Sequence, residues 1–125
     1  MTPKLIKSFQ ASNADVTGRR IVAFDGNGGL VDAALNTDAI IGVSDELGGK
    51  ADEMTDVILV GIADVTAGGD IDAGDPLTTD ADGKAIKAVP TAGVEMRAVG
   101  FALLDASDGD FFPVLLQPHV IAPLA

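Results

Sequence analysis

The side chains that most often carry catalysis are few and scattered in this sequence. His119 is the only histidine, it stands between Pro118 and Val120, and there is no cysteine to pair with it. None of the four serines lies in a Gly-x-Ser-x-Gly nucleophile elbow: Ser8, Ser12, Ser44 and Ser107. Catalysis needs such groups held in pairs at tuned pKa values. We therefore expect a surface position for His119 and no enzymatic activity.

Two kinds of glycine cluster could cradle a phosphate, and neither completes its motif. The run 26–31 (GNGGLV) begins like a dinucleotide fingerprint, but Val31 stands where the third glycine belongs. Lys50 and Lys84 each follow a glycine, without the earlier glycine or the following Ser or Thr of a P-loop. These clusters are interpreted as turns, and no cofactor is expected.

Calcium binding is the one chemical activity that the sequence favours at all, because calcium takes carboxylate oxygens from Asp-rich loops. The best spaced set is Asp70, Asp72 and Asp75, at relative positions 1, 3 and 6, where an EF-hand uses 1, 3 and 5 and a Glu at 12. Two looser groups are Asp105, Asp108 and Asp110, and Asp80 with Asp82. Solvated turn aspartates are the simpler interpretation, so a structural calcium site here is a hypothesis.

The composition indicates one folded domain. The chain has 125 residues and a mass of 12.6 kDa, with 47% hydrophobic residues and a mean hydropathy of +0.34. Those values exclude a disordered acidic tail, and no apolar run approaches the roughly 18–20 residues of a membrane-spanning helix. The absence of cysteine excludes disulfides and thiolate metal sites. Residues 1–7 lack signal-peptide features, so we expect synthesis in a cytoplasm and no membrane partner.

Charge is unevenly distributed along the chain. Eight basic and 19 acidic residues give a net charge of −11, and such a surface repels phosphate backbones, so nucleic-acid binding is not expected. Residues 1–20 carry four basic groups and Asp15, whereas residues 21–125 carry four basic and 18 acidic groups. The basic start is either a chance excess of lysine or an arm that docks on another molecule.

Turn residues recur every 8 to 15 positions, which is the spacing of short strands. Sixteen of the 19 acidic residues are Asp, which favours turns by capping nearby backbone amides. Hairpin turns are expected at 25–29 and at 82–83, and Pro113 suggests an edge strand. The expected extended segments are 4–10, 19–24, 30–35, 39–43, 56–65, 77–79, 84–88, 94–106 and 111–116.

Two segments leave helix as an alternative. The run 56–65 (DVILVGIADV) is apolar on both faces, β-branched and interrupted by Gly61, which favours a strand buried on both sides or in an oligomer contact. The run 94–106 is ambiguous, and Gly100 favours a strand there. The predicted fold is all-β: a small single-domain β-barrel or compact β-sandwich with short hairpins and at most one or two helical turns. Its parts are an extended N-terminal arm (1–17), a β-domain (18–117) and a C-terminal tail (118–125).

The order of several small-residue motifs resembles one known family. The motifs are Ala-Gly-Gly at 67–69, Gly-Asp-Pro-Leu at 74–77, Asp-Ala-Asp-Gly-Lys-Ala at 80–85 and Val-Gly-Phe-Ala-Leu at 99–103. Two upstream motifs fit the same order, Ile41-Gly42-Val43-Ser44 and Val60-Gly61. The pattern resembles the capsid cement, or head decoration, proteins of tailed bacteriophages over roughly residues 18–117. It also supports a strand at 94–106.

This resemblance implies a structural protein of the virion. Proteins of this kind bind the outer face of the expanded head and stabilise it, often as homotrimers at local threefold positions, with the major capsid protein as partner. In similar proteins an N-terminal arm reaches onto the capsid protein, which suits the basic start of this chain. The expected docking residues are Lys4, Leu5, Ile6, Lys7 and Phe9, assisted by Arg19 and Arg20. The expected oligomer contact is Val57, Ile58, Leu59 and Val60.

Two other functions remain open at this point. A tail or baseplate accessory protein with a similar β-fold would assemble on tail tubes instead of head shells. A small ligand-binding module, with or without calcium, would show a ligand-induced rise in melting temperature that a cement protein lacks.

Overall fold

The computed structural model describes residues 4–123, which form nine β-strands connected by turns and loops. Within this range no helix is long and apolar enough to span a membrane. The strands are β1 (Leu5–Gln10), β2 (Ile21–Phe24), β3 (Leu30–Asp32), β4 (Ala39–Ser44), β5 (Met54–Thr66), β6 (Pro76–Thr79), β7 (Ala85–Lys87), β8 (Met96–Ala102) and β9 (Phe111–Ile121). The all-β prediction is confirmed.

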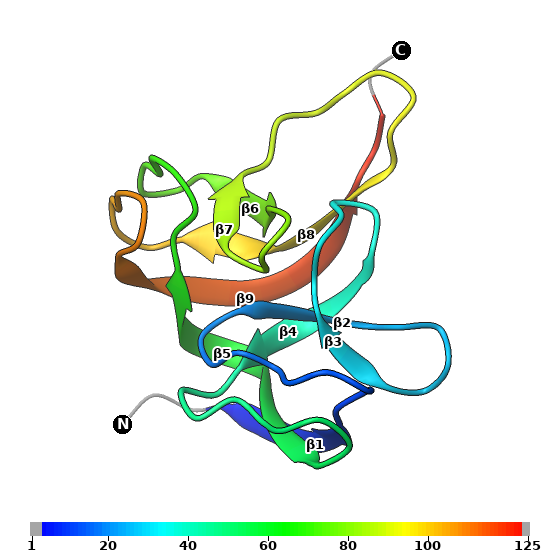
Figure 1. Ribbon diagram of the computed structural model, residues 1–125. Coiled ribbons are helices and arrows are strands. Elements are labelled where there is room, and N and C mark those ends of the chain that lie inside the picture. The colour runs from blue at the N-terminus through cyan, green and yellow to red at the C-terminus, as the bar shows by residue number, and fades with distance from the viewer. Residues whose placement is uncertain (1–3, 124–125) are drawn as a thin grey trace.

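All nine strands belong to one antiparallel sheet (Figure 1). Its order is β3-β2-β4-β5-β9-β8-β6-β7, and β1 pairs with β5 beside this path. Because the order begins at β3 and ends at β7, the sheet is open, and the closed barrel among the expected architectures is not what the described residues form. The sheet instead bends, so that one half with β2, β3 and β4 faces another with β6, β7, β8 and β9.

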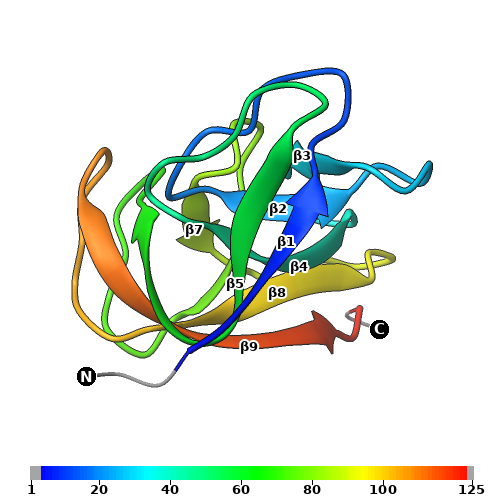
Figure 2. The ribbon, with the colours of Figure 1, turned by 90° about the horizontal axis from the view of Figure 1, so that it is seen from below.

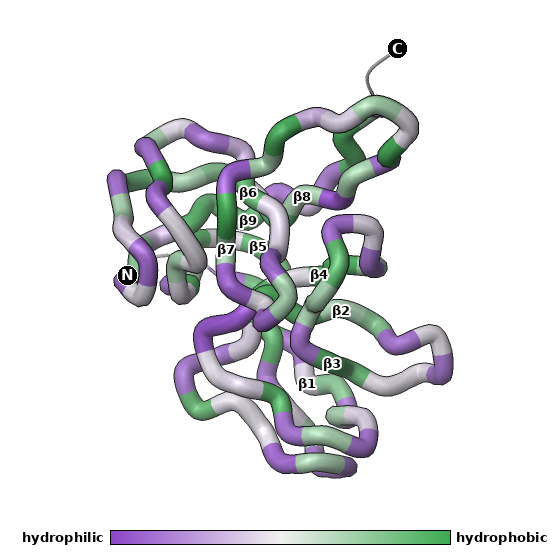
Figure 3. The backbone as a smooth tube through the Cα atoms, turned by 45° about the horizontal axis from the view of Figure 1, so that its top comes forward, coloured by the Kyte–Doolittle hydropathy of each residue, from purple (hydrophilic) through white to green (hydrophobic). Residues whose placement is uncertain are grey.

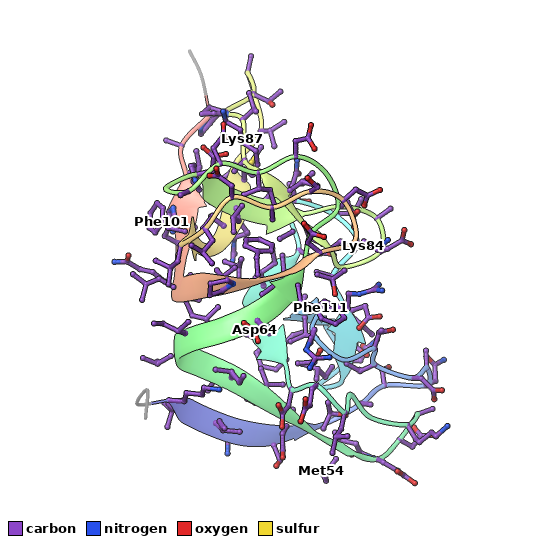
Figure 4. All side chains as sticks on the ribbon, turned by 90° about the vertical axis from the view of Figure 1, so that its left-hand side faces the viewer. Met54, Asp64, Lys84, Lys87, Phe101 and Phe111 are labelled. Carbon is purple, nitrogen blue, oxygen red and sulfur yellow. The ribbon has the colours of Figure 1, made fainter. Side chains whose placement is uncertain are left out.

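Strand β5 connects the two halves. Its first part pairs with β1 and β4, and its second part pairs with β9 from Gly61 onward. Gly61 lies at this junction with a φ of 109°, a conformation that L side chains rarely adopt. Figure 4 shows the sharp change of direction of the green β5 ribbon. A glycine inside the most apolar strand therefore lets a single strand serve both halves of the sheet.

Two apolar cores lie on opposite faces of the strands that separate them. The main core lies between the two halves of the sheet and includes Ile21 and Ile58. The second core is smaller and includes Val22 and Val57, the sequence neighbours of those two residues. Since successive side chains of a strand point to opposite faces, β2 and β5 bury both faces within one protomer. This accounts for the apolar residues on both faces of segment 56–65.

Aspartates cap the turns, as the composition predicts. The Asp25 carboxylate accepts hydrogen bonds from the Ser12 hydroxyl (2.7 Å) and from the amides of Asn27 (2.6 Å) and Gly29 (3.1 Å), which fixes the β2–β3 hairpin. Asp80 accepts from the Asp82 and Lys84 amides in the β6–β7 hairpin. Both predicted hairpins are confirmed, and hydrophilic (purple) stretches recur in the connecting loops of Figure 3.

The last strand differs from the expectation. Pro113 does not mark an edge, because β9 lies between β5 and β8. Its carbonyl oxygen accepts a hydrogen bond from the Leu103 amide, so its nitrogen faces the same neighbour, which lies just beyond the end of β8. Strand β9 also continues through Pro118 to Ile121, into the segment expected to be a tail, and pairs there with the start of β8.

We predict that Gly61→Ala lowers the free energy of unfolding by about 1–3 kcal/mol, because the added Cβ is strained at this φ. Gly69→Ala is the control, since a Cβ at Gly69 meets no atom within 4 Å and its φ is not in the left-handed region. Urea unfolding of both variants is the measurement. Equal stability of the two would show that the bend of β5 does not depend on this glycine.

A second prediction concerns acid stability. The Ser12 hydroxyl, with the Asn27 and Gly29 amides, holds the pKa of Asp25 below its ordinary value of 3.8. A lowered pKa contributes stability above pH 3.8 that is lost as the pH falls through the folded-state pKa. Asp25→Ala should therefore lower Tm at pH 7 and pH 5, and the difference from the parent should shrink below pH 4. The same change at the exposed Asp108 should leave Tm nearly constant at every pH.

Candidate docking surface

The basic N-terminal segment forms an ordered strand along its own domain. β1 pairs antiparallel with β5, from Gln10 opposite Met54 to Leu5 opposite Val60, with a register shift between Leu5 and Ile6 (Figure 2). β1 is an edge strand, because among the strands of residues 4–123 only β5 forms a ladder with it. The expected arm is thus extended but lies along the domain.

Phe9 fastens β1 to the body. Its ring packs against the second core and meets the ring of Phe24 edge-on, with 5.5 Å between centroids. The Lys7 ammonium lies over the other side of this ring, 5.7 Å from the centroid. Edge-to-face aromatic contacts of this kind contribute about 0.5–1.5 kcal/mol beyond the area they bury. Phe9, one of the expected docking residues, is therefore an internal anchor of the strand.

The other four residues of the expected arm contact face solvent. Lys4 and Lys7 are exposed, and Leu5 and Ile6 keep 55% and 48% of their surface accessible. Within residues 4–123 the salt bridges are Arg19–Glu46 and Lys87–Asp75, so neither Lys4 nor Lys7 is in one. These four residues lie exposed along a strand of fixed position and alternate between its two faces.

Arg19 makes its contacts within the protomer. Its guanidinium bonds Glu46 at 2.9 Å and lies over the ring of Phe111, 4.4 Å from the centroid. Its φ of 56° is in the left-handed region, and its carbonyl oxygen accepts from the Thr66 amide at the end of β5. Arg19 thus joins the start of β2 to β5 and β9 across the fold.

Arg20 also has internal partners. Its Nη1 donates to the Asp82 carbonyl oxygen at 2.8 Å, and next to it the Ile21 amide donates to the Gly83 carbonyl oxygen. These bonds hold the β6–β7 turn against β2. Burial raises the pKa of the nearby Asp32, an effect that hydrogen bonds from Thr17 and the charge of Arg20 oppose. The two arginines expected to assist docking therefore clamp the two halves of the sheet.

The expected oligomer contact divides into buried and accessible residues. Val57 and Ile58 are 0% and 4% exposed, because each fills one of the two cores. Neither presents surface to a partner in this fold. Leu59 is partly buried against the second core, and Val60 is 54% exposed. The surface of this segment is therefore contributed by Leu59 and Val60.

Sequence reasoning missed apolar surface on the neighbouring strands. Leu115 of β9 is 40% exposed and lies directly opposite Ile62 of β5 and Phe101 of β8, both of which are partly exposed. In the structure, exposed and buried residues alternate from 111 to 115, but the run FFPVLL has no polar residue, so the sequence carries no signal for which of them face outward. The neighbours of Leu115 become apparent only from the strand register.

In the aspartate clusters, three carboxylates accept hydrogen bonds from backbone amides. The Asp75 carboxylate accepts from the Asp72 amide, that of Asp105 from the Ala73 amide, and that of Asp110 from the Ser107 amide. Across residues 4–123, no three His, Cys, Asp or Glu side chains converge to hold a metal ion. The set Asp70, Asp72 and Asp75 is thus not brought together as a ligand cluster. His119 stacks on Phe101 at 5.3 Å, and its Nδ1 lies 2.7 Å from the Gln117 carbonyl oxygen.

Two comparisons with known proteins give a match, one to a family and one to a solved fold. A family model described as phage cement protein matches residues 2–116. Among solved structures, the N base of the head fiber gp8.5 of bacteriophage phi29 is similar, with a TM-score of 0.66 and 24% sequence identity over 90% of this chain and 95% of that one. No curated protein matches.

The open all-β domain with its exposed strand β1 is therefore a structural protein of the phage capsid. The chain belongs to the phage cement protein family, and its role is capsid decoration. The resemblance stated from residues 18–117 is confirmed, and the match extends it to residues 2–116, which include β1.

We predict that replacing excess calcium with a chelator leaves Tm unchanged. Two of the candidate carboxylates, Asp75 and Asp105, already accept backbone hydrogen bonds. An ion that binds only the folded state would raise Tm by an amount that grows with the ratio of its concentration to its Kd. The measurement is thermal unfolding in millimolar calcium and in chelator, with magnesium as the control ion. A rise of Tm specific to calcium would contradict this prediction and support a site at Asp70, Asp72 and Asp75.

Proposed function

We propose that this cement protein binds the outer surface of the expanded phage head through β1, with the major capsid protein as its partner, and stabilises the shell. The observation that supports this proposal is the exposure of Lys4, Leu5, Ile6 and Lys7 on a strand fixed by Phe9. A preorganised strand loses little conformational entropy when it docks, which favours binding. The net charge of −11 on the whole chain keeps decorated particles apart in solution.

A second part of the proposal is that copies on the shell associate as homotrimers, with Leu59 and Val60 at the contact. The 54% exposure of Val60, in a run from Val57 to Val65 whose other apolar side chains are buried or half-buried, supports this placement. Each copy then contributes one β1 to the shell, and three linked contacts bind far more tightly than one. A role of this kind needs stiffness and contact area, and we propose no catalytic step for it.

The experiment that tests the proposed function is co-sedimentation of the purified protein with expanded, undecorated heads. Saturation at a fixed simple ratio to the major capsid protein is the expected result, because a cement protein occupies symmetry-defined sites. Isolated tails and unexpanded heads serve as comparison particles. Binding to tails alone would contradict the proposal and favour the tail accessory function instead.

Charge reversal at β1 gives a sharper prediction. The double variant Lys4→Glu/Lys7→Glu should bind expanded heads about tenfold more weakly, and the salt dependence of its binding should be smaller, because two attractive charges become repulsive. Lys50→Glu, a reversal at an exposed lysine in the loop before β5, is the control and should bind like the parent. Equal binding by all three proteins would exclude β1 as the charged contact.

A further inference from the structure

Strand register places a row of apolar residues straight across the outer face of the sheet. Pro76 of β6 lies opposite Phe101 of β8, Phe101 opposite Leu115 of β9, and Leu115 opposite Ile62 of β5. Two residues before Ile62, Val60 lies opposite Leu5 of β1. We call these six residues the apolar stripe, and they come from five different strands.

All six residues of the apolar stripe are accessible. Leu5, Val60 and Leu115 are 55%, 54% and 40% exposed, and Ile62, Phe101 and Pro76 are partly exposed. In Figure 4 the labelled Phe101 lies on the same side of the molecule as the bend of β5 and the start of the blue β1. Contiguous apolar surface on an otherwise charged protein marks an interaction site.

The stripe contains no charged residue, although the chain has 19 acidic groups. Asp64, opposite Pro113, flanks it on β5, and Lys4 precedes Leu5 at its β1 end. Depletion of charge with a polar margin is the composition of the centre of a protein interface. The lysine end of the stripe suits a partner that carries carboxylates beside an apolar area.

The free edge of β1 is a less suitable docking element than this face. A register shift interrupts the strand between Leu5 and Ile6, and Lys4 and Lys7 flank it. Irregular pairing and lysines are the features by which natural sheets prevent the addition of further strands. Docking by side chains on the sheet face is therefore favoured over docking by backbone pairing.

We propose that the apolar stripe docks on the shell together with β1, so that both form one continuous contact face. This inference rests on the proposed function. A stable protein contact uses about 20–30 residues a side, far more than the four outward-facing residues of the arm, and the stripe adjoins them at Leu5. A second copy is a less suitable occupant of the whole stripe, because the trimer contact proposed above uses only its Val60 end. The paired residues Ile62, Leu115 and Phe101 are left for the shell.

The test compares two double variants in which two accessible apolar residues become threonine. Ile62→Thr/Leu115→Thr alters two directly paired residues of the stripe that lie outside the proposed trimer contact, and threonine suits both strands. Val89→Thr/Leu35→Thr is the control, because these residues are 59% and 62% exposed and lie outside the stripe. Affinity for expanded heads is measured by co-sedimentation, the association state of the free protein by analytical ultracentrifugation, and folding by Tm.

The expected result is a loss of affinity of about tenfold or more for the stripe variant alone, with Tm and association state like those of the parent. Parent-like head binding by the stripe variant would overturn the inference and leave the proposed function standing. Loss of self-association with head binding retained would assign the stripe to a contact between copies and also overturn it. Failure of the parent protein to bind heads would overturn the proposed function itself.

Discussion

The whole fold depends on one strand that must serve two halves of a sheet. β5 pairs with β1 and β4 before Gly61 and with β9 after it, and its side chains alternate between two apolar cores. Straightening β5 would separate the halves and expose the main core between them. The positive φ of Gly61 is thus the local constraint that makes a small open sheet enclose a core without closing into a barrel.

A second constraint is electrostatic. A chain with 19 acidic groups must fold without bringing them together in apolar surroundings, and it does so by placing aspartates in turns, where backbone amides bond the carboxylates. The few cations are divided by position. Arg19 and Arg20 hold elements of the two halves together, whereas Lys4 and Lys7 remain on the surface of β1. The basic character of residues 1–20 therefore has an internal part and an external part.

Much of this fold can be predicted from local sequence, because its signals are local. Asp82-Gly83 marks a hairpin by turn chemistry alone, and the interrupted apolar run around Gly61 marks a long buried strand. Strand order is not local. Pro113 suggests an edge by its missing amide, yet β9 is central, because the position that lacks the donor lies just past the end of β8.

The candidate site was predictable to a smaller extent. Exposure of Lys4 to Lys7 follows from their polarity and position in the sequence, but the inward turn of Phe9 depends on Phe24, fifteen residues away. Burial of Val57 and Ile58 depends on two cores built from distant strands. Composition likewise cannot show that Leu115 stands beside Ile62 and Phe101, because only the register of three strands brings them together.

The register of the strands also determines when this surface can exist. Strand β1 pairs with β5 in the middle of the chain, and β5 pairs with β9 near its end, so the contacts span large separations in sequence. Folds dominated by such pairings form slowly, because the loops between the strands must close before any contact is gained. Leu5 and Leu115 occupy one face only after nearly the whole chain has left the ribosome and folded. A chain that lacks β9 lacks Leu115 and therefore does not carry this face.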